Sequence, residues 1–165
     1  MTGAAVDRIR SADVSVRGIG RVRISASDKG ICGIGFLRRS AGKHALSRTA
    51  PAVLRKAAEE LRLYAQGRLK RFSVPVDISR VTGFTKLVLQ RTQKIPYGRT
   101  INYRQLASAL GRPHACRAAG NSLGKNPVPI IIPCHRVIKA DGSPGGFSSG
   151  VERKELLLKL EGISF

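Results

Sequence analysis

The spacing of apolar residues changes near residue 80, and this change limits the possible folds more than any other feature. Before it, apolar and polar residues alternate, as at Val14 and Val16, which is typical of half-buried strands. After it, apolar residues recur at helical spacing, as at Phe84, Leu87 and Val88. The sequence therefore predicts two domains with different secondary structure.

The first domain, residues 1–80, is predicted to be α/β, a small sheet with one helix. Glycines interrupt the strand pattern over 14–37, so short antiparallel strands are expected there. Residues 50–67 carry apolar residues at helical spacing. Residues 72–78 alternate again, but Pro75 has no N–H to donate and limits this segment to an edge strand.

The second domain, residues 81–165, is predicted to be mostly helical and similar to a winged helix. Asn102 is followed by a glutamine at the spacing of a capping box, which marks a helix start. Gly111 ends that helix and a second is expected over 114–123, which gives a helix-turn-helix. A last helix is expected over 151–161. Its inner face is expected to carry Leu156, Leu157 and Leu160.

The chain is strongly basic. It has 30 Lys and Arg against 10 Asp and Glu, a formal net charge of +20. No acidic residue occurs between Asp77 and Asp141, although many basic residues do. Thermophilic surfaces are also rich in Lys, but they add Glu as ion-pair partners. The composition therefore favours nucleic acid as a partner over an ordinary solvated surface.

The cysteines exclude several classes of protein. Cys32, Cys116 and Cys134 are too few for a disulfide framework. The Cys and His residues have none of the usual metal-ligand spacings, so no metal is expected. The longest apolar run, around 130–132, is far shorter than a membrane span, and no signal peptide opens the chain. We expect a cytoplasmic protein without membrane, metal or cofactor.

Cys134 and His135, each taken alone, would be interpreted as ordinary buried residues. The segment around them changes this interpretation. Residues 132–137, with the sequence IPCHRV, resemble the active-site signature of the O6-alkylguanine-DNA alkyltransferases. The resemblance covers roughly residues 83–162 and includes segments 95–98, 103–106, 117–120, 126–127 and 158–162.

The resemblance implies DNA repair by direct transfer. An alkyl group would pass from O6-alkylguanine in double-stranded DNA to Cys134, irreversibly and once per molecule. O4-alkylthymine is a second candidate substrate, and no cofactor is implied. The protein is expected to act as a monomer at the nucleoid, with cooperative binding along DNA left open.

The family also implies roles for the residues around the nucleophile. His135 would contact Cys134 through a water and would be held by Glu161. A carboxylate at a helix C-terminus opposes the helix dipole, so Glu161 is expected to have another partner. Tyr103 would crowd the 3′ phosphate and protonate the departing guanine. Asn126 would act as a hinge between the recognition helix and the active-site segment.

Other residues are implied to contact DNA. Arg117 would fill the space left by a flipped base, with Leu123 as an apolar contact beside it. Ala118 and Gly120 are small residues that let the recognition helix approach another surface closely. These four positions make the second helix of the pair the predicted DNA-binding element.

The alkylated base would be held by the active-site segment and the loop after it. The carbonyls of Cys134 and Val137 would accept from the exocyclic amine of guanine, and the N–H of Ser148 would donate to its oxygen. Phe147 and Ser149 stand where many family members have Tyr and Gly. Ser149 is expected to narrow the space for bulky adducts or else to face solvent.

Two other functions remain open from the sequence. A helix-turn-helix regulator would bind one DNA sequence and take up no alkyl group. A cysteine hydrolase would turn over repeatedly and need an oxyanion hole beside Cys134. Three of the predicted site residues also have a purely structural interpretation. Tyr103 would then be a core aromatic residue, Arg117 a solvated charge and Glu161 an ordinary charge at a helix end.

Overall fold

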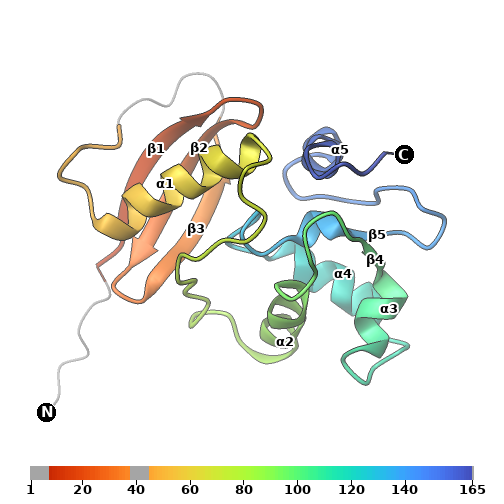
Figure 1. The fold of residues 1–165 in the computed structure, drawn as a ribbon. Coiled ribbons are helices and arrows are strands. Elements are labelled where there is room, and N and C mark those ends of the chain that lie inside the picture. Colours follow the sequence, from red (N-terminus) through yellow and green to blue (C-terminus); the bar gives the residue numbers. More distant parts are fainter. Residues whose placement is uncertain (1–7, 38–44, 165) are drawn as a thin grey trace, which may run out of the picture.

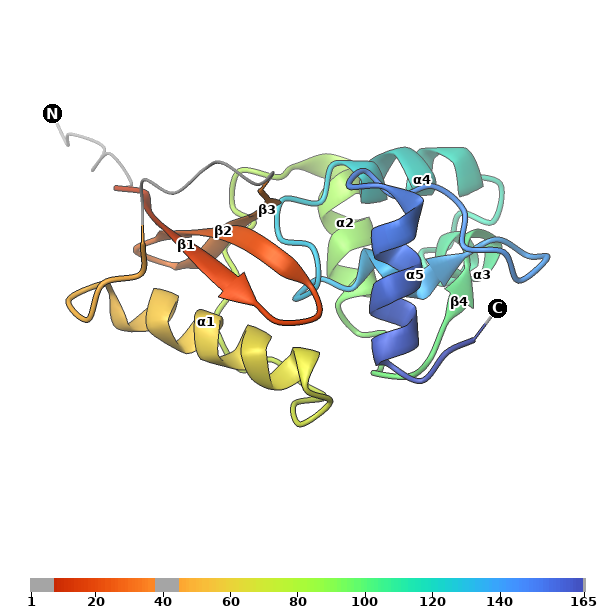
Figure 2. The ribbon, with the colours of Figure 1, turned by 90° about the horizontal axis from the view of Figure 1, so that it is seen from above.

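The computed structural model describes residues 8–37 and 45–164 of the chain (Figure 1). An antiparallel sheet and one helix form the N-terminal half, as the α/β prediction requires. The sheet has the order β1-β2-β3, and α1 packs on one of its faces (Figure 1, Figure 2). The elements are β1 (Arg10–Val16), β2 (Gly20–Ser27), β3 (Gly30–Phe36) and α1 (Ala52–Ala65).

The sheet and α1 share one apolar layer. Val14 lies opposite Val22, and Ile24 lies opposite Ile34, so alternate side chains of three strands reach the same face. That face meets the buried stripe of α1, which includes Leu61. The alternating and helical patterns of the first half therefore converge on one core.

Residues 72–78 form less structure than predicted. Instead of an edge strand, only one parallel bridge is present, between Ile31 and Val76. The N–H of Ile31 donates to Pro75 O at 2.8 Å, and the N–H of Asp77 donates to Ile31 O at 2.8 Å. Pro75 lacks an N–H, so the ladder cannot continue through it. Gly30 allows this approach, because a Cβ there would lie 2.5 Å from Pro75 O.

The C-terminal half is mostly helical, as predicted, and lies to one side of the sheet and α1 in both views (Figure 1, Figure 2). A short parallel pair, β4 with β5, was not anticipated from the sequence. The elements are α2 (Gly83–Thr92), β4 (Ile101–Asn102), α3 (Tyr103–Ser108), α4 (Cys116–Gly124), the 3₁₀ turn Cys134–Arg136, β5 (Val137–Ile138) and α5 (Val151–Leu160).

The predicted helix pair is α3 and α4. Asn102 Oδ1 accepts from the N–H of Gln105 at 2.8 Å, and the Gln105 side chain accepts from the N–H of Asn102 at 2.7 Å, which completes the capping box. Gly111 follows α3 with φ +69°, a conformation that favours glycine. Helix α4 begins at Cys116, slightly later than the sequence indicated.

The inner face of α5 differs from the prediction. Leu157 and Leu158 are buried, whereas Leu156 is 36% exposed and Leu160 is only partly buried. Lys154 lies on the buried face with Leu157 and Leu158, at the i, i+3, i+4 spacing of one helix face. The expected inner face of Leu156, Leu157 and Leu160 is therefore correct only at Leu157, because the buried face is rotated and includes Lys154 and Leu158.

The segment that leads to Cys134 lies between the two halves. The N–H of Ile34 in β3 donates to Pro127 O at 2.8 Å, which joins the sheet to this segment. Ile130 is fully buried and has φ 77°, an unfavourable value for a β-branched residue. Tertiary packing therefore overrides local preference here. Over the described residues, no helix is long and apolar enough to cross a membrane.

Candidate active site

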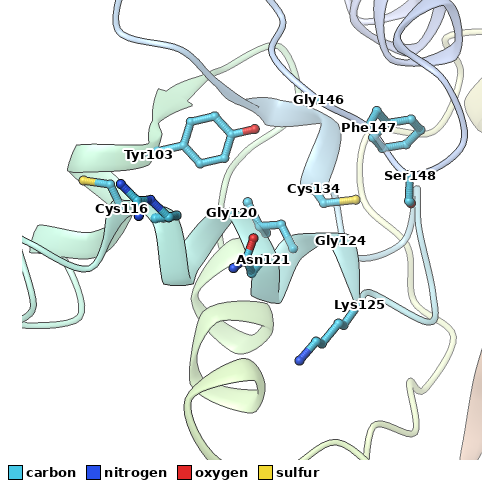
Figure 3. A pocket seen from close by; sticks show the side chains of 12 residues that line it. Tyr103, Cys116, Gly120, Asn121, Gly124, Lys125, Cys134, Gly146, Phe147 and Ser148 are labelled. Carbon is cyan, nitrogen blue, oxygen red and sulfur yellow. The ribbon is translucent and has the colours of Figure 1, made fainter.

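A cavity of about 860 Å³ opens between α3, α4 and the loop before α5. Cys134 lies in it, and Tyr103 and Phe147 lie on opposite sides of this cysteine (Figure 3). The lining residues are Tyr103, Cys116, Arg117, Gly120, Asn121, Leu123, Gly124, Lys125, Cys134, Gly146, Phe147 and Ser148. The helix pair and the active-site segment therefore enclose one space.

Cys134 is held by the segment before it. Asn126 Nδ2 donates to Ile132 O at 2.8 Å and lies 3.1 Å from the Sγ of Cys134. Asn126 Oδ1 accepts from the N–H of Val128 at 3.0 Å. One amide thus ties the end of α4 to the nucleophile, at the position predicted for a hinge.

The Cys134 side chain is only 6% exposed. Burial raises the pKa of its thiol, while the hydrogen bond from Asn126 and the charge of Lys154 lower it. The net direction is upward, so the resting group is a thiol and needs a base before it can act as a nucleophile.

His135 lies behind Cys134 and is completely buried. Its Nε2 is 2.9 Å from Glu161 Oε1. Burial lowers the pKa of His135 and Glu161 opposes this, with a net decrease, so the ring is neutral near pH 7. A neutral ring that donates from Nε2 leaves Nδ1 as an acceptor. Nδ1 is buried and has no hydrogen-bond partner among the residues described.

Glu161 caps α5 and accepts hydrogen bonds from four residues. Its partners include Arg136, through Nε at 2.9 Å and Nη2 at 2.8 Å, and the N–H of Gly98 at 3.0 Å. Tyr64 donates from Oη at 2.7 Å, and His135 is the fourth. Burial acts to raise the pKa of Glu161, but these bonds lower it to about 2. The carboxylate therefore has the additional partners that its place at a helix end required.

Tyr103 opens α3, and its ring faces α4 and the loop before α5. A Cβ at Gly120 would lie 3.6 Å from its Cε1, and one at Gly145 would lie 3.3 Å from its Oη. Burial raises the pKa of Tyr103 and Cys134 adds to the increase, so the hydroxyl keeps its proton. The half-buried phenol borders the same cavity as Cys134.

The residues predicted to contact DNA occupy different faces of α4. Arg117 and Leu123 line the cavity, and Gly120 faces Tyr103. Ala118 is exposed on α4 and is not part of the cavity lining. Cys116 also lines the cavity, on the far side of Tyr103 from Cys134 (Figure 3).

Of the residues predicted to hold the base, some line the cavity and others lie outside it. Phe147 and Ser148 line the cavity, whereas Val137 and Ser149 do not. Val137 is fully buried, and its carbonyl accepts from Lys154 Nζ at 2.6 Å. Ser149 is partly exposed, and its carbonyl accepts from Arg153 Nη1 at 2.9 Å.

Lys154 was missed by the sequence analysis. It is 1% exposed, and no carboxylate of the described residues forms an ion pair with it. Burial lowers its pKa to about 8, and Cys134 opposes this decrease. The spacing of Lys154 with Leu157, Leu158 and Glu161 was the signal that could have placed it inside the molecule.

Tyr64 and Arg136 were also missed. Both contact the carboxylate of Glu161, and Arg136 also donates to Ile95 O. Arg136 belongs to the IPCHRV segment, so its place beside His135 was available as a signal. Tyr64 comes from α1, and its spacing with Leu61 and Ala57 suggested only a core position.

Models of two domain families match the chain. One is described as the DNA-binding domain of 6-O-methylguanine DNA methyltransferase and matches residues 83–163. The other is described as the ribonuclease-like domain of the same enzyme and matches residues 18–78.

Curated relatives carry the name methylated-DNA–protein-cysteine methyltransferase. One from Methanosarcina barkeri is 45% identical over 65% of this chain and 67% of its own. One from Mycobacterium tuberculosis is 42% identical over 67% of each chain.

Solved structures agree with this. The Mycobacterium tuberculosis O6-methylguanine methyltransferase matches with a TM-score of 0.80 and 32% identity, over 93% of each chain. The structure of Mycobacterium tuberculosis OGT in complex with DNA matches with a TM-score of 0.78 and 34% identity, over 93% of this chain and 91% of that one. The chain therefore belongs to the 6-O-methylguanine DNA methyltransferase family, a family of methylated-DNA–protein-cysteine methyltransferases.

Proposed function

We propose that this protein repairs DNA by moving an alkyl group from the O6 atom of guanine to the Sγ of Cys134, once per molecule. The observation that carries the proposal is the position of Cys134, inside a cavity and next to a neutral, buried histidine with a free acceptor nitrogen. The names of the relatives and the DNA-bound neighbour support the substrate class.

The reaction needs no component beyond protein and DNA. His135 Nδ1 accepts the thiol proton, directly or through a water, and Glu161 stabilises the resulting imidazolium. The Cys134 thiolate attacks the alkyl carbon, an S–C bond forms and the C–O6 bond breaks. Tyr103 donates a proton to the departing guanine and is reprotonated from His135, so the thiol proton ends on neutral guanine. The thioether is stable to thiols, and no second nucleophile releases the alkyl group.

The target atom lies inside a base stack, so the nucleotide must leave the helix to reach Cys134. Arg117 and Leu123 on α4 line the cavity, and we propose that they fill the vacated space. Ala118 and Gly120 allow α4 to approach DNA closely. Phe147 and Ser148, which line the cavity, would contact the extruded base, and Asn126 would keep the nucleophile aligned with α4. Val137 and Ser149 lie outside the lining and would act on the base only through their neighbours.

Mass spectrometry tests the transfer. The protein is incubated with duplex DNA that contains O6-methylguanine, and the intact mass is measured. We expect a gain of one methyl group, located on Cys134, and none in Cys134→Ala. Cys32→Ala and Cys116→Ala are matched controls that should label like the wild type. Repeated turnover, or a label on either of those cysteines, contradicts the proposal.

The alternative is a helix-turn-helix regulator without transfer activity. Phosphate contacts from a basic surface give affinity that depends on salt and hardly on sequence. We expect the affinity for unmodified DNA to fall by roughly a thousandfold or more between about 50 and about 200 mM salt, if six or more phosphates are contacted. Strong preference for one unmodified sequence, with no methyl uptake, would favour the regulator.

We further propose a monomer at the chromosome, where its substrate is, with the domain boundary near residue 80. Analytical ultracentrifugation of the free protein tests the first point. A titration with DNA of increasing length tests cooperative binding. Separate expression of residues 81–165 tests the boundary.

A further inference from the structure

Tyr64 links the N-terminal half to the residues behind Cys134. It lies in the last turn of α1 and is completely buried. Its ring contacts Phe72, with centroids 5.4 Å apart, and meets Tyr97 edge to face at 6.0 Å. Its Oη donates to Glu161 Oε1 at 2.7 Å and lies 3.4 Å from His135 Nε2.

Tyr64 and His135 share one oxygen atom. His135 Nε2 is 2.9 Å from the same Glu161 Oε1 that accepts from Tyr64. Each additional donor withdraws charge from a carboxylate oxygen and makes it a weaker acceptor for the others. The phenol and the imidazole therefore compete for the negative charge of one oxygen.

We propose that Tyr64 is a positioning residue for alkyl transfer, through which the N-terminal half limits how strongly Glu161 holds a proton on His135. The inference rests on the proposed function and adds a component that lies outside the cavity. With the Tyr64 hydroxyl present, His135 stays neutral and able to accept the Cys134 proton near pH 7. Without it, Glu161 would interact more strongly with imidazolium, and a larger fraction of molecules would lack a free base.

Other groups around His135 set the background for this effect. Arg136 on the same turn and Lys154 on α5 both lower the pKa of His135, and Glu161 raises it. Near His135, the titratable and charged groups are those of Cys134, Arg136, Lys154, Glu161, Tyr64 and Tyr97. Burial and Glu161 raise the pKa of Tyr64, so its hydroxyl keeps its proton throughout any accessible pH range.

Tyr97 provides a matched control. It contacts the Tyr64 ring, but its Oη donates to the backbone oxygen of Leu160 at 2.7 Å. None of the hydrogen bonds to the Glu161 carboxylate from the described residues involves it. Tyr64→Phe and Tyr97→Phe each remove one hydroxyl from the same aromatic contact. Only Tyr64→Phe changes the hydrogen bonding of the carboxylate.

The test is the pH dependence of the methyl-transfer rate to Cys134, measured in single-turnover experiments on the wild type and both variants. Tyr64→Phe should move the midpoint of the acid limb upward by about one pH unit, because one unit equals the free energy of a typical hydrogen bond. Its rate on the alkaline side should stay within about twofold of the wild type, since the base is then neutral in both. Tyr97→Phe should leave the midpoint unchanged. An unchanged midpoint in Tyr64→Phe, or equal shifts in both variants, overturns the inference.

Two further measurements keep the inference separate from the proposed function. The ¹⁵N chemical shifts of the His135 ring report its protonation without any substrate, and they should show the same upward shift in Tyr64→Phe. A wild type that takes up no methyl group defeats the proposed function alone.

If Tyr64→Phe folds poorly, a fluorinated tyrosine at position 64 keeps the ring and makes the hydroxyl a stronger donor. This variant should lower the midpoint of the acid limb of the rate and the midpoint of the His135 ring titration. A shift of either midpoint in the other direction overturns the inference.

Discussion

The two sides of Cys134 are built in opposite ways. Towards the cavity lies the cavity wall, formed by Tyr103, Arg117, Phe147 and Ser148, which are exposed or half-buried. On the other side lies the buried polar cluster, formed by Tyr64, His135, Arg136 and Glu161, all of them buried. The cavity wall must admit and release DNA, whereas the buried polar cluster must hold one protonation state away from bulk solvent.

This difference predicts how each side responds to substitution. A group in the buried polar cluster has several partners, and its loss leaves them unsatisfied in a nonpolar environment. A group in the cavity wall has solvent as an alternative partner. Substitutions in the cluster should therefore cost stability as well as activity, and those in the wall should cost activity alone.

The largest effect is expected from Glu161→Gln. Arg136 would remain buried without a counter-charge, and removal of one member of a buried pair costs about 3–5 kcal/mol. Urea unfolding and methyl uptake measure the two losses. Glu59→Gln is the matched control, because the Glu59 side chain is 61% exposed and forms a 3.7 Å ion pair with the half-buried Arg62. Its unfolding free energy should change by less than about 1 kcal/mol. Similar losses in both variants would remove the contrast between buried and exposed carboxylates.

Acid should weaken the buried polar cluster in the same direction. The pKa of Glu161 is lowered from 4.5 to about 2 in the folded protein. A lowered folded pKa contributes stability that is complete above about pH 4.5 and is lost as the pH falls towards 2. Asp77 contributes in the same window, since its pKa is also lowered to about 2, by hydrogen bonds from Ser27 and Ser79. Urea midpoints measured from pH 6 to pH 2 should fall, and part of this fall should be absent in Glu161→Gln.

Lys154 lies between the cavity wall and the buried polar cluster. The substitution Lys154→Met should change the methyl-transfer rate without a large change in the free energy of unfolding. Loss of the charge near Cys134 should raise the thiol pKa and slow methyl transfer by about tenfold, for a change of about one pKa unit. The loss of the Lys154 hydrogen bond to Val137 O is offset by removal of a buried charge that has no ion pair among the described residues, so the unfolding free energy should change by less than about 2 kcal/mol. Lys159→Met is the control, because Lys159 is exposed on the same helix. A slow variant that is also strongly destabilised would assign Lys154 to folding instead.

Arg117→Ala tests the cavity wall. Repair of duplex DNA should slow by about tenfold or more, since unstacking costs a few kcal/mol. The reaction with free O6-methylguanine should change little. Tyr103→Phe should slow both reactions, because its proton is needed in each. Arg104→Ala removes an exposed charge on α3 and should weaken DNA binding without slowing saturated repair. Equal losses of Arg117→Ala on duplex and free base would exclude its role in base extrusion.

The smallest effect is expected from Ser149→Gly. Ser149 does not line the cavity, so the methyl-transfer rate should be nearly unchanged. Glycine would loosen the backbone of the loop that carries Phe147 and Ser148. A modest gain of about twofold with a benzyl adduct is expected, equivalent to about 0.4 kcal/mol. Equal benzyl rates in the two proteins would show that this position does not affect the width of the site.

Most of the fold could be predicted from the sequence, because the elements that the local patterns favour are the ones that the tertiary contacts stabilise. The alternating residues of β1 and β2 and the capping box at Asn102 each form the predicted element. The β4–β5 pair was not predicted, since two-residue strands have no periodicity. The strand expected at 72–78 is a single bridge, because pattern alone does not show which N–H groups have partners.

The sequence predicted the part of the candidate site that lies within one contiguous motif. Cys134 and His135 adjoin in sequence, and Glu161 was expected to need a partner at a helix end. Lys154 and Tyr64 were missed for a physical reason: a lysine is almost always solvated, and a tyrosine at helical spacing is almost always core. Their polar atoms acquire a role only when segments distant in sequence meet.

The bond between Tyr64 and Glu161 has a consequence for the order of folding. It joins residues 97 positions apart, whereas the capping box of α3 closes over three. Closing a long loop costs more entropy than closing a short one, so local elements form before distant ones meet. We therefore expect the contact of Tyr64 with Glu161 to be among the last to form. We expect a partly folded chain to expose Cys134 as an ordinary thiol, so that the proposed reaction with DNA begins only after the two halves have docked.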